Sequence, residues 1–211
     1  MIAPESDVSL LQIEIPESIK QLPHTARASR LIDDANDRLE AFMLKDQQVI
    51  ENFVNCDFHL VDQAFQWIHQ NHLLTGNRFC EFGSGFGVAT MLAAVRGMES
   101  VGIEIESVLV AESSELADDV NVNARFYCGS FVPRGGSDAL ELEFDVEHVD
   151  TLEGDVYDEI GLEIDDFDLF FAFPWPGEHG FFESVFDHCA ADGAMLLTYR
   201  GREGMNLVRK V

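Results

Sequence analysis

Short apolar runs alternate with helical segments from residue 78 to the end of the chain. The runs are rich in apolar residues and have the length of buried strands. They are Arg78–Phe82, Ser100–Ile105, Ala124–Cys128, Asp168–Phe173 and Ala194–Tyr199. The segments between them with helical periodicity are Val88–Arg96, Ser107–Asp118, Leu152–Ile160 and Gly180–Ala191. Strands that alternate with helices in this way predict right-handed crossovers and an α/β fold with a doubly wound, mainly parallel sheet.

The first part of the chain has a different pattern. Residues 1–24 hold three prolines and no helical stripe, so we expect an extended arm. Helical stripes follow, the first formed by Leu31, Ala35, Leu39 and Phe42. We therefore assign residues 1–56 to an N-terminal arm and helical extension, and residues 57–211 to the main domain, whose first helix has Asp57 as a candidate N-cap.

The two ends of the sheet carry less regular segments. Residues 132–166 form an acidic insertion, in which Leu140–Val146 alternates with the period of an edge strand or hairpin. The calcium-loop pattern is missing there, which favours a solvated acidic face. Gly201–Gly204 is typical of a hairpin turn, after which Asn206–Val211 would return as the one antiparallel strand. We expect about six strands, a truncated C-terminal antiparallel end, and a further edge strand if the insertion supplies one.

The charge of the chain limits its partners. Thirty-nine Asp and Glu against thirteen Lys and Arg give a formal net charge of −26, and only three of the cations are lysines. Basic patches bind polyanions, so nucleic acid is an improbable partner for this acidic protein. The surplus of carboxylate is typical of proteins adapted to salty surroundings; the alternative is an electrostatic funnel for cationic substrates.

The cellular setting follows from the cysteines and from the lack of long apolar runs. Four cysteines show no C-x-x-C pair, and we interpret Cys80 and Cys128 as small hydrophobic residues in buried strands. The amino terminus has no signal-peptide pattern, and no run approaches the length of a membrane span. We expect a cytoplasmic protein with no membrane partner; its oligomeric state carries no signal in the sequence.

Three glycines stand at alternate positions in segment 79–87, between a predicted strand and a helix. Gly83, Gly85 and Gly87 allow a sharp turn and let backbone N–H groups approach a ligand. The dinucleotide pattern G-x-G-x-x-G is not met, because its last glycine falls on Val88. The segment therefore predicts a ligand cradle at the point where the strand ends.

An acidic residue follows this segment at the end of the next predicted strand. Glu104 would lie beside the glycine loop in any doubly wound sheet, where a carboxylate accepts hydrogen bonds from a ribose 2′- and 3′-hydroxyl pair. Ile105, the next residue, would present an apolar side chain to a nucleobase. Strand, glycines, helix, strand and acid at this spacing together indicate nucleoside binding.

With these motifs, residues 57–211 resemble the class I S-adenosylmethionine-dependent methyltransferases. The resemblance implies that Glu81 engages the methionine amino group and that the loop containing Ser84 holds the cofactor, with Glu104 on the ribose. Ser130 stands where many members have an aspartate against the adenine, and Phe131 follows it. Asp57 would close over the methionine end, although helix capping explains it equally well.

The segment after the fourth predicted strand matches the fourth motif of these enzymes. Members that act on base amino groups have Asp or Asn where this chain has Ala172, which argues against a DNA adenine methyltransferase. Phe173 and Trp175 could stack on a planar substrate, Pro174 orders the loop, and Glu178 could orient an amine or accept its proton. These four residues are the catalytic candidates. Alternatively, the loop only packs the turn and Glu178 caps the next helix.

Methyl transfer depends on alignment and needs no metal, and the histidines form no ligand set: His69 and His72 lack a second pair. The sequence thus predicts an S-adenosylmethionine-dependent methyltransferase acting on an unidentified small molecule or protein acceptor. Two alternatives remain. One is a catalytically inactive S-adenosylmethionine-binding sensor or partner domain, and the other is a nicotinamide-dependent oxidoreductase.

Overall fold

The structure is a computed structural model that describes residues 9–45, 56–136 and 152–211, except for the side chain of residue 45. The predicted alternation of strands and helices is present from residue 78 onward. In chain order the elements are β1 (Leu10–Ile13), η1 (Glu17–Gln21), α1 (Ala26–Lys45), α2 (Phe58–Gln70), β2 (Arg78–Phe82), α3 (Val88–Val95), β3 (Glu99–Glu104), α4 (Ser107–Asp119), β4 (Ala124–Cys128), α5 (Val156–Ile160), η2 (Ile164–Asp166), β5 (Leu169–Ala172), α6 (His179–Cys189), β6 (Met195–Tyr199), η3 (Gly201–Glu203) and β7 (Met205–Lys210).

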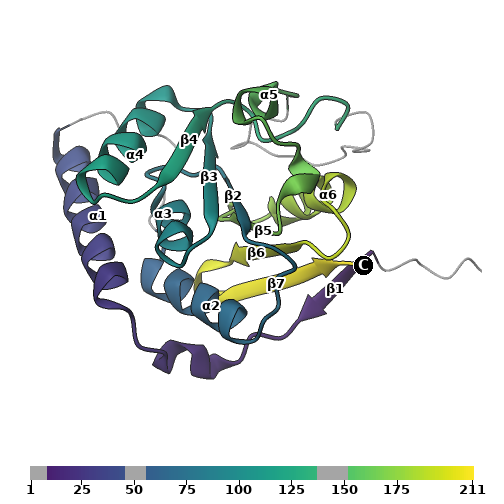
Figure 1. The fold of residues 1–211 in the computed structure, drawn as a ribbon, viewed down its shortest axis with the longest axis horizontal. Helices are drawn as coiled ribbons and strands as arrows, with labels where there is room; N and C mark the ends of the chain where they lie inside the picture. The colour runs from purple at the N-terminus through teal and green to yellow at the C-terminus, as the bar shows by residue number, and fades with distance from the viewer. Residues whose placement is uncertain (1–8, 46–55, 137–151) are drawn as a thin grey trace, which may run out of the picture.

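The described strands form one sheet in the order β1-β7-β6-β5-β2-β3-β4 (Figure 1). The five strands from β6 to β4 in this order run parallel, whereas β7 is antiparallel to both of its neighbours. The returning strand predicted at Asn206–Val211 is therefore present as β7. The sheet has seven strands, one more than the six expected. The additional strand, β1, comes from the N-terminal arm, and the alternating stretch Leu140–Val146 lies outside the described residues.

Alternate residues of the strands face two separate cores. Phe79, Phe171 and Leu197 pack with helices α1 to α4 on one face, and Phe82 and Phe170 pack with α5 and α6 on the other. Figure 1 shows these two groups of helices on opposite sides of the sheet. Strands buried on both faces explain why the sequence shows continuous apolar runs instead of a polar–apolar alternation.

Helix α1 belongs to the first of these cores. Leu31, Ala35 and Leu39 of the predicted stripe are buried, and Phe42 packs edge-on against Phe86, with ring centroids 5.1 Å apart. On its outer side Arg38 holds Glu112 of α4 at 2.9 Å and two further carboxylates of the same helix. The helical extension thus shares its core with the main domain.

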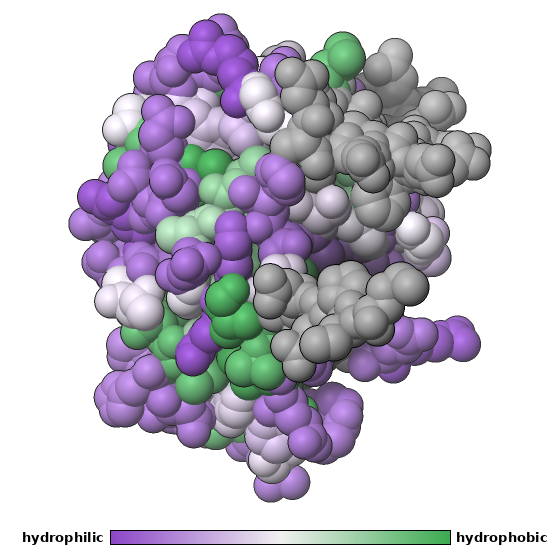
Figure 2. Space-filling model, turned by 90° about the vertical axis from the view of Figure 1, so that its right-hand side faces the viewer, coloured by the Kyte–Doolittle hydropathy of each residue, from purple (hydrophilic) through white to green (hydrophobic). Residues whose placement is uncertain are grey.

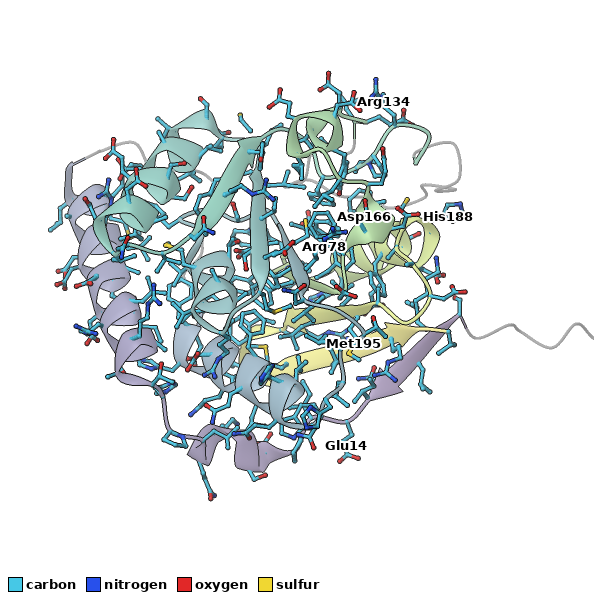
Figure 3. All side chains as sticks on the ribbon, in the orientation of Figure 1. Glu14, Arg78, Arg134, Asp166, His188 and Met195 are labelled. Atoms are coloured by element: carbon cyan, nitrogen blue, oxygen red, sulfur yellow. The ribbon has the colours of Figure 1, made fainter. Side chains whose placement is uncertain are left out.

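Figure 2 shows one face of the molecule, which is mostly hydrophilic and has several smaller hydrophobic areas. Several cations are paired with acids: Arg78, at the amino end of β2, forms an ion pair with Asp166 at 3.3 Å (Figure 3). Cys128 was expected to be buried but is exposed, because β4 is the last strand of the sheet, and its thiol lies 3.4 Å from the Ile105 carbonyl oxygen. Across the described ranges, no helix combines the length and hydropathy of a membrane span.

Candidate functional site

The turn from β2 to α3 is built on three glycines in the left-handed region. Gly83, Gly85 and Gly87 have φ angles of 70°, 53° and 68°. At Gly87 an added Cβ atom would lie only 2.1 Å from the ring of Phe126, so this position excludes a side chain for both conformational and steric reasons. The backbone N–H groups of Gly83 and Ser84 both donate to the carbonyl of Ile103, at 2.9 Å, which ties the turn to β3.

Glu104 ends β3 directly beside this turn. Its Oε2 accepts a hydrogen bond from the Gly85 N–H at 2.8 Å, and its Oε1 accepts one from the Glu106 N–H at 3.0 Å. The side chain is buried, and burial raises the pKa of Glu104 above its usual value. The carboxylate therefore lies against the glycine turn, held by two backbone donors.

Glu81, in β2, is the second buried acid of the site. Its Oε2 accepts hydrogen bonds from the backbone N–H of Thr90 at 2.9 Å and from the Thr90 hydroxyl at 2.5 Å. Burial raises the pKa of Glu81 to about 8, the hydrogen bonds from Thr90 oppose this rise, and the negative charge of Glu104 adds to it. At neutral pH this carboxyl group is therefore largely protonated in the ligand-free protein.

A cavity of about 770 Å³ lies at the carboxyl ends of the parallel strands and reaches both acids. Ser130 and Phe131, which follow β4, line it together with Ile105, whose side chain is 47% exposed. Phe131 stacks on Phe82 with ring centroids 4.6 Å apart, which fixes this apolar wall. The edge of an open α/β sheet at which strands end is where such folds bind ligands, and the volume is within the usual range of about 300–1,000 Å³.

The predicted catalytic segment lies on the same cavity. Phe173, Pro174, Trp175 and Glu178 all line it. Glu178 occupies the N-cap position of α6, but its side chain makes no capping hydrogen bond, contrary to the capping alternative. Ala172 is fully buried at the end of β5, so it offers the cavity no polar group.

Two of the residues assigned to the cofactor site lie apart from the cavity lining. Asp57 is exposed, and its side chain accepts a hydrogen bond from the Leu60 N–H at 3.0 Å as the N-cap of α2. Its neighbours Cys56 and Phe58 line the cavity instead. Gly87 also lies outside the lining, at the N-cap position where the turn leads into α3.

Sequence reasoning missed a part of the cavity lining that comes from α6 and from the turn after β6. His179 and Phe182 of α6 and the turn Arg200–Glu203 after β6 line the cavity. Burial lowers the pKa of His179, the positive charge of Arg200 lowers it further, and nearby glutamates oppose both effects. The available signal was topological: β6 is a parallel strand, so the turn that follows it lies at the same edge as the glycine turn.

In the parts of the chain that the structure describes, no group of three or more His, Cys, Asp or Glu side chains is arranged to hold a metal ion. The site therefore consists of backbone donors, three buried carboxyl groups (Glu81, Glu104 and Glu178), an aromatic wall and two arginines. This set suits an organic ligand with hydroxyl and amino groups.

No protein-family profile and no curated protein matches this sequence. Among solved structures, a methyltransferase from Geobacter sulfurreducens matches with a TM-score of 0.56 and 11% identity, over 90% of this chain and 93% of that one. A hypothetical protein from Thermus thermophilus matches with a TM-score of 0.52 and 15% identity, over 79% and 93% of the two chains. An RNA methyltransferase from Salinibacter ruber, solved with S-adenosyl-L-homocysteine, has a TM-score of 0.49 and 17% identity, over 74% and 92%. The architecture of this chain is the class I, Rossmann-like methyltransferase fold.

Proposed function

We propose that the protein is an S-adenosylmethionine-dependent methyltransferase that acts on a small molecule or a protein side chain. The observation that carries the proposal is the contact between Glu104 and the Gly85 N–H, which joins the ribose-type acid to the glycine turn inside one cavity. The shared fold supports it, because the G. sulfurreducens structure is that of a methyltransferase.

The residues around the cavity suit this cofactor. Glu104 has a carboxylate at the edge where a ribose diol would bind, and Ile105 offers an exposed apolar side chain for the adenine. Glu81 lies further along the same cavity, where its carboxyl group would meet the methionine amino group. Gly102 keeps β3 close to the turn, since a Cβ atom there would come within 2.8 Å of the Ser84 side chain.

The bound cofactor supplies an activated methyl group, and the protein has to orient the acceptor and exclude water. Phe173 and Trp175 provide an aromatic surface for a planar acceptor. Pro174 fixes one φ angle in this loop, so the wall is ordered before the acceptor binds. Glu178, which is 4% exposed and lines the cavity, would orient an acceptor N–H or O–H group and take its proton. A chain of net charge −26 repels phosphates, which argues against a nucleic acid as the acceptor.

The first experiment is calorimetric titration of S-adenosylhomocysteine into the wild type and Glu104→Gln. The amide nitrogen of Gln accepts no hydrogen bonds, so it replaces one carboxylate oxygen that would accept from the backbone and from a ribose hydroxyl. We therefore expect the affinity for S-adenosylhomocysteine to fall about tenfold or more. Glu106→Gln is the matched control, because it removes the same charge at the same cavity while leaving the Glu104 contacts in place. Equal affinity for wild type and Glu104→Gln would refute the ribose assignment.

Two other candidates are tested with the same protein. Ala172, buried where amino-methylating relatives have a polar residue, favours the alternative of an inactive sensor domain. Tritiated methyl transfer to a cell lysate separates the two, since label that is lost in Trp175→Ala or Glu178→Ala requires an enzyme. A nicotinamide-dependent oxidoreductase would bind nicotinamide dinucleotide more tightly than S-adenosylmethionine in the same calorimetric titration.

A further inference from the structure

Cations are scarce in this chain, and within the described ranges all but one of the Lys and Arg side chains form a hydrogen bond or an ion pair inside the protein. The residues with a hydrogen bond or ion pair, outside the turn after β6, are Lys20, Arg27, Arg30, Arg38, Arg78, Arg96, Arg125, Arg134, Arg209 and Lys210. Arg134, for example, pairs with Asp158 on the surface beside α5 (Figure 3). In a protein of net charge −26, this is the expected use of each positive charge.

Arg202 is the exception among the side chains that the structure describes. It is exposed on the turn η3, lines the cavity, and forms no hydrogen bond or ion pair with any described residue. Arg200, two positions earlier, also lines the cavity. Its Nη2 holds Glu183 of α6 at 2.7 Å, which orients the side chain, and its Nε is buried without a hydrogen-bond partner among the described residues. The turn therefore presents the guanidinium donors of Arg202 to the cavity, with Arg200 beside it.

Charged groups of the opposite sign are also present at this end. Glu183 is already paired with Arg200, Glu203 is exposed next to Arg202, and Glu178 is buried. Arg202 forms no ion pair with Glu178 or Glu203, so its guanidinium keeps its donors for a ligand. An anionic ligand is repelled by most of this surface, so it needs a local cation in order to enter.

We propose that the acceptor of this methyltransferase is a small molecule with an aromatic ring and a carboxylate, and that Arg202, supported by Arg200, binds the carboxylate. The planar fork of a guanidinium matches a carboxylate with two parallel hydrogen bonds. Phe173, Trp175 and Phe182 line the cavity between the turn and the sheet and provide the surface on which the ring packs. This inference rests on the proposed function and adds the chemical class of the acceptor.

Three probes that share one ring test it: 4-hydroxyphenylacetate, its neutral amide and the cation tyramine. Each is titrated into the protein in saturating S-adenosylhomocysteine, and the affinity of S-adenosylhomocysteine itself is measured separately. We expect the carboxylate to bind about fivefold or more tighter than the amide, and tyramine to bind weakest. Arg202→Gln should weaken the carboxylate about five- to tenfold and leave the amide within about twofold. Arg202→Lys should keep part of the preference, because it keeps the charge.

Arg125→Gln is the control for net charge, because Arg125 is exposed, lies outside the cavity lining and contacts only the Tyr127 hydroxyl among the described residues. It should leave all three affinities unchanged. The inference is overturned if the amide binds as tightly as the carboxylate, if tyramine binds tightest, or if none of the probes binds at about millimolar concentration. It is also overturned if Arg202→Gln weakens S-adenosylhomocysteine as much as the probe, since the arginine would then serve the cofactor. Failure of S-adenosylhomocysteine to bind the wild type would instead refute the proposed function itself.

Discussion

Glu81 at the end of β2 is held by Thr90 in the first turn of α3, through hydrogen bonds of 2.9 Å from the backbone N–H and 2.5 Å from the hydroxyl. Both donors bind the same oxygen, Oε2. The contact joins the strand and the helix on either side of the glycine turn. The two hydrogen bonds thereby hold an acid at the cavity in spite of the cost of its burial, since Glu81 is only 6% exposed.

The stability of the protein should depend on pH through this group. Burial raises the pKa of Glu81 to about 8, whereas the unfolded chain has a value near that of free glutamate, about 4.3. Between these values the folded state holds a proton that the unfolded state has lost, so this group lowers stability as pH rises through the window. Glu81→Gln stays neutral. The unfolding free energy of this variant should therefore rise relative to that of the wild type between about pH 4.5 and 8, by on the order of 5 kcal/mol, and the difference should stay constant at higher pH.

Urea unfolding of the two proteins from pH 4.5 to 9 measures the difference. Glu40→Gln, exposed on α1, serves as the control for the loss of one carboxylate and should show no such rise. A flat difference between wild type and Glu81→Gln would mean that Glu81 is ionised in the folded protein at all these pH values.

Two glycines of the turn separate backbone strain from steric exclusion. Gly83 and Gly87 have almost the same φ, 70° and 68°, but a Cβ atom at Gly83 meets nothing within 4 Å, whereas at Gly87 it meets the Phe126 ring at 2.1 Å. Gly83→Ala should lower the unfolding free energy by about 1 kcal/mol, the cost of a left-handed alanine. Gly87→Ala adds the clash and should cost about 3 kcal/mol or more.

Denaturant unfolding of both variants, without ligand, gives the comparison. Shortening the partner in Gly87→Ala/Phe126→Leu should restore part of the loss, because the ring no longer occupies the space. Equal destabilisation of the two single variants would show that Phe126 moves aside without cost.

The sequence predicted the parts of this site that depend on local pattern. Strand β2 was placed at Arg78–Phe82 and the next helix from Val88, because the apolar run ends at three glycines and a helical stripe begins after them. Glu104 was predicted to belong to the site because of its spacing along the chain from that turn. The crossover rule then fixes its place beside the turn, and the hydrogen bond to Gly85 has the geometry of such a placement.

Other features depend on contacts between distant residues, which leave little local signal. Strand β1 pairs Leu10 with Lys210 across almost the whole chain, so the four-residue strand was visible only as an extended segment. Arg202 was predicted within the hairpin turn Gly201–Gly204, which follows Arg200, and the position of both arginines on the cavity depends on where β6 ends in the sheet. Cys128 was misplaced for a similar reason, since an apolar run alone does not reveal that its strand is an edge.

A buried acid connects the N-terminal segment to the main domain. Asp62 of α2 is fully buried, and its Oδ1 holds Arg96, the C-cap residue of α3, at 2.7 Å. Its Oδ2 lies 2.7 Å from Nδ1 of His24, which precedes α1. Removing this charge leaves a largely buried guanidinium with only neutral acceptors, among them Gln66 Oε1, so we expect Asp62→Asn to lower the unfolding free energy by about 3 kcal/mol.

His24→Ala should be milder, at about 1 kcal/mol, because it removes a neighbour of Asp62 but keeps the pair with Arg96. Unfolding of Asp62→Asn, Arg96→Gln and the double variant gives the coupling between the two charges. We expect the double variant to be clearly less destabilised than the sum of the single ones, since it leaves neither charge unpaired. Additive losses, or a cost below about 1 kcal/mol for Asp62→Asn, would mean that water replaces the ion pair and that packing alone attaches α2 to α3.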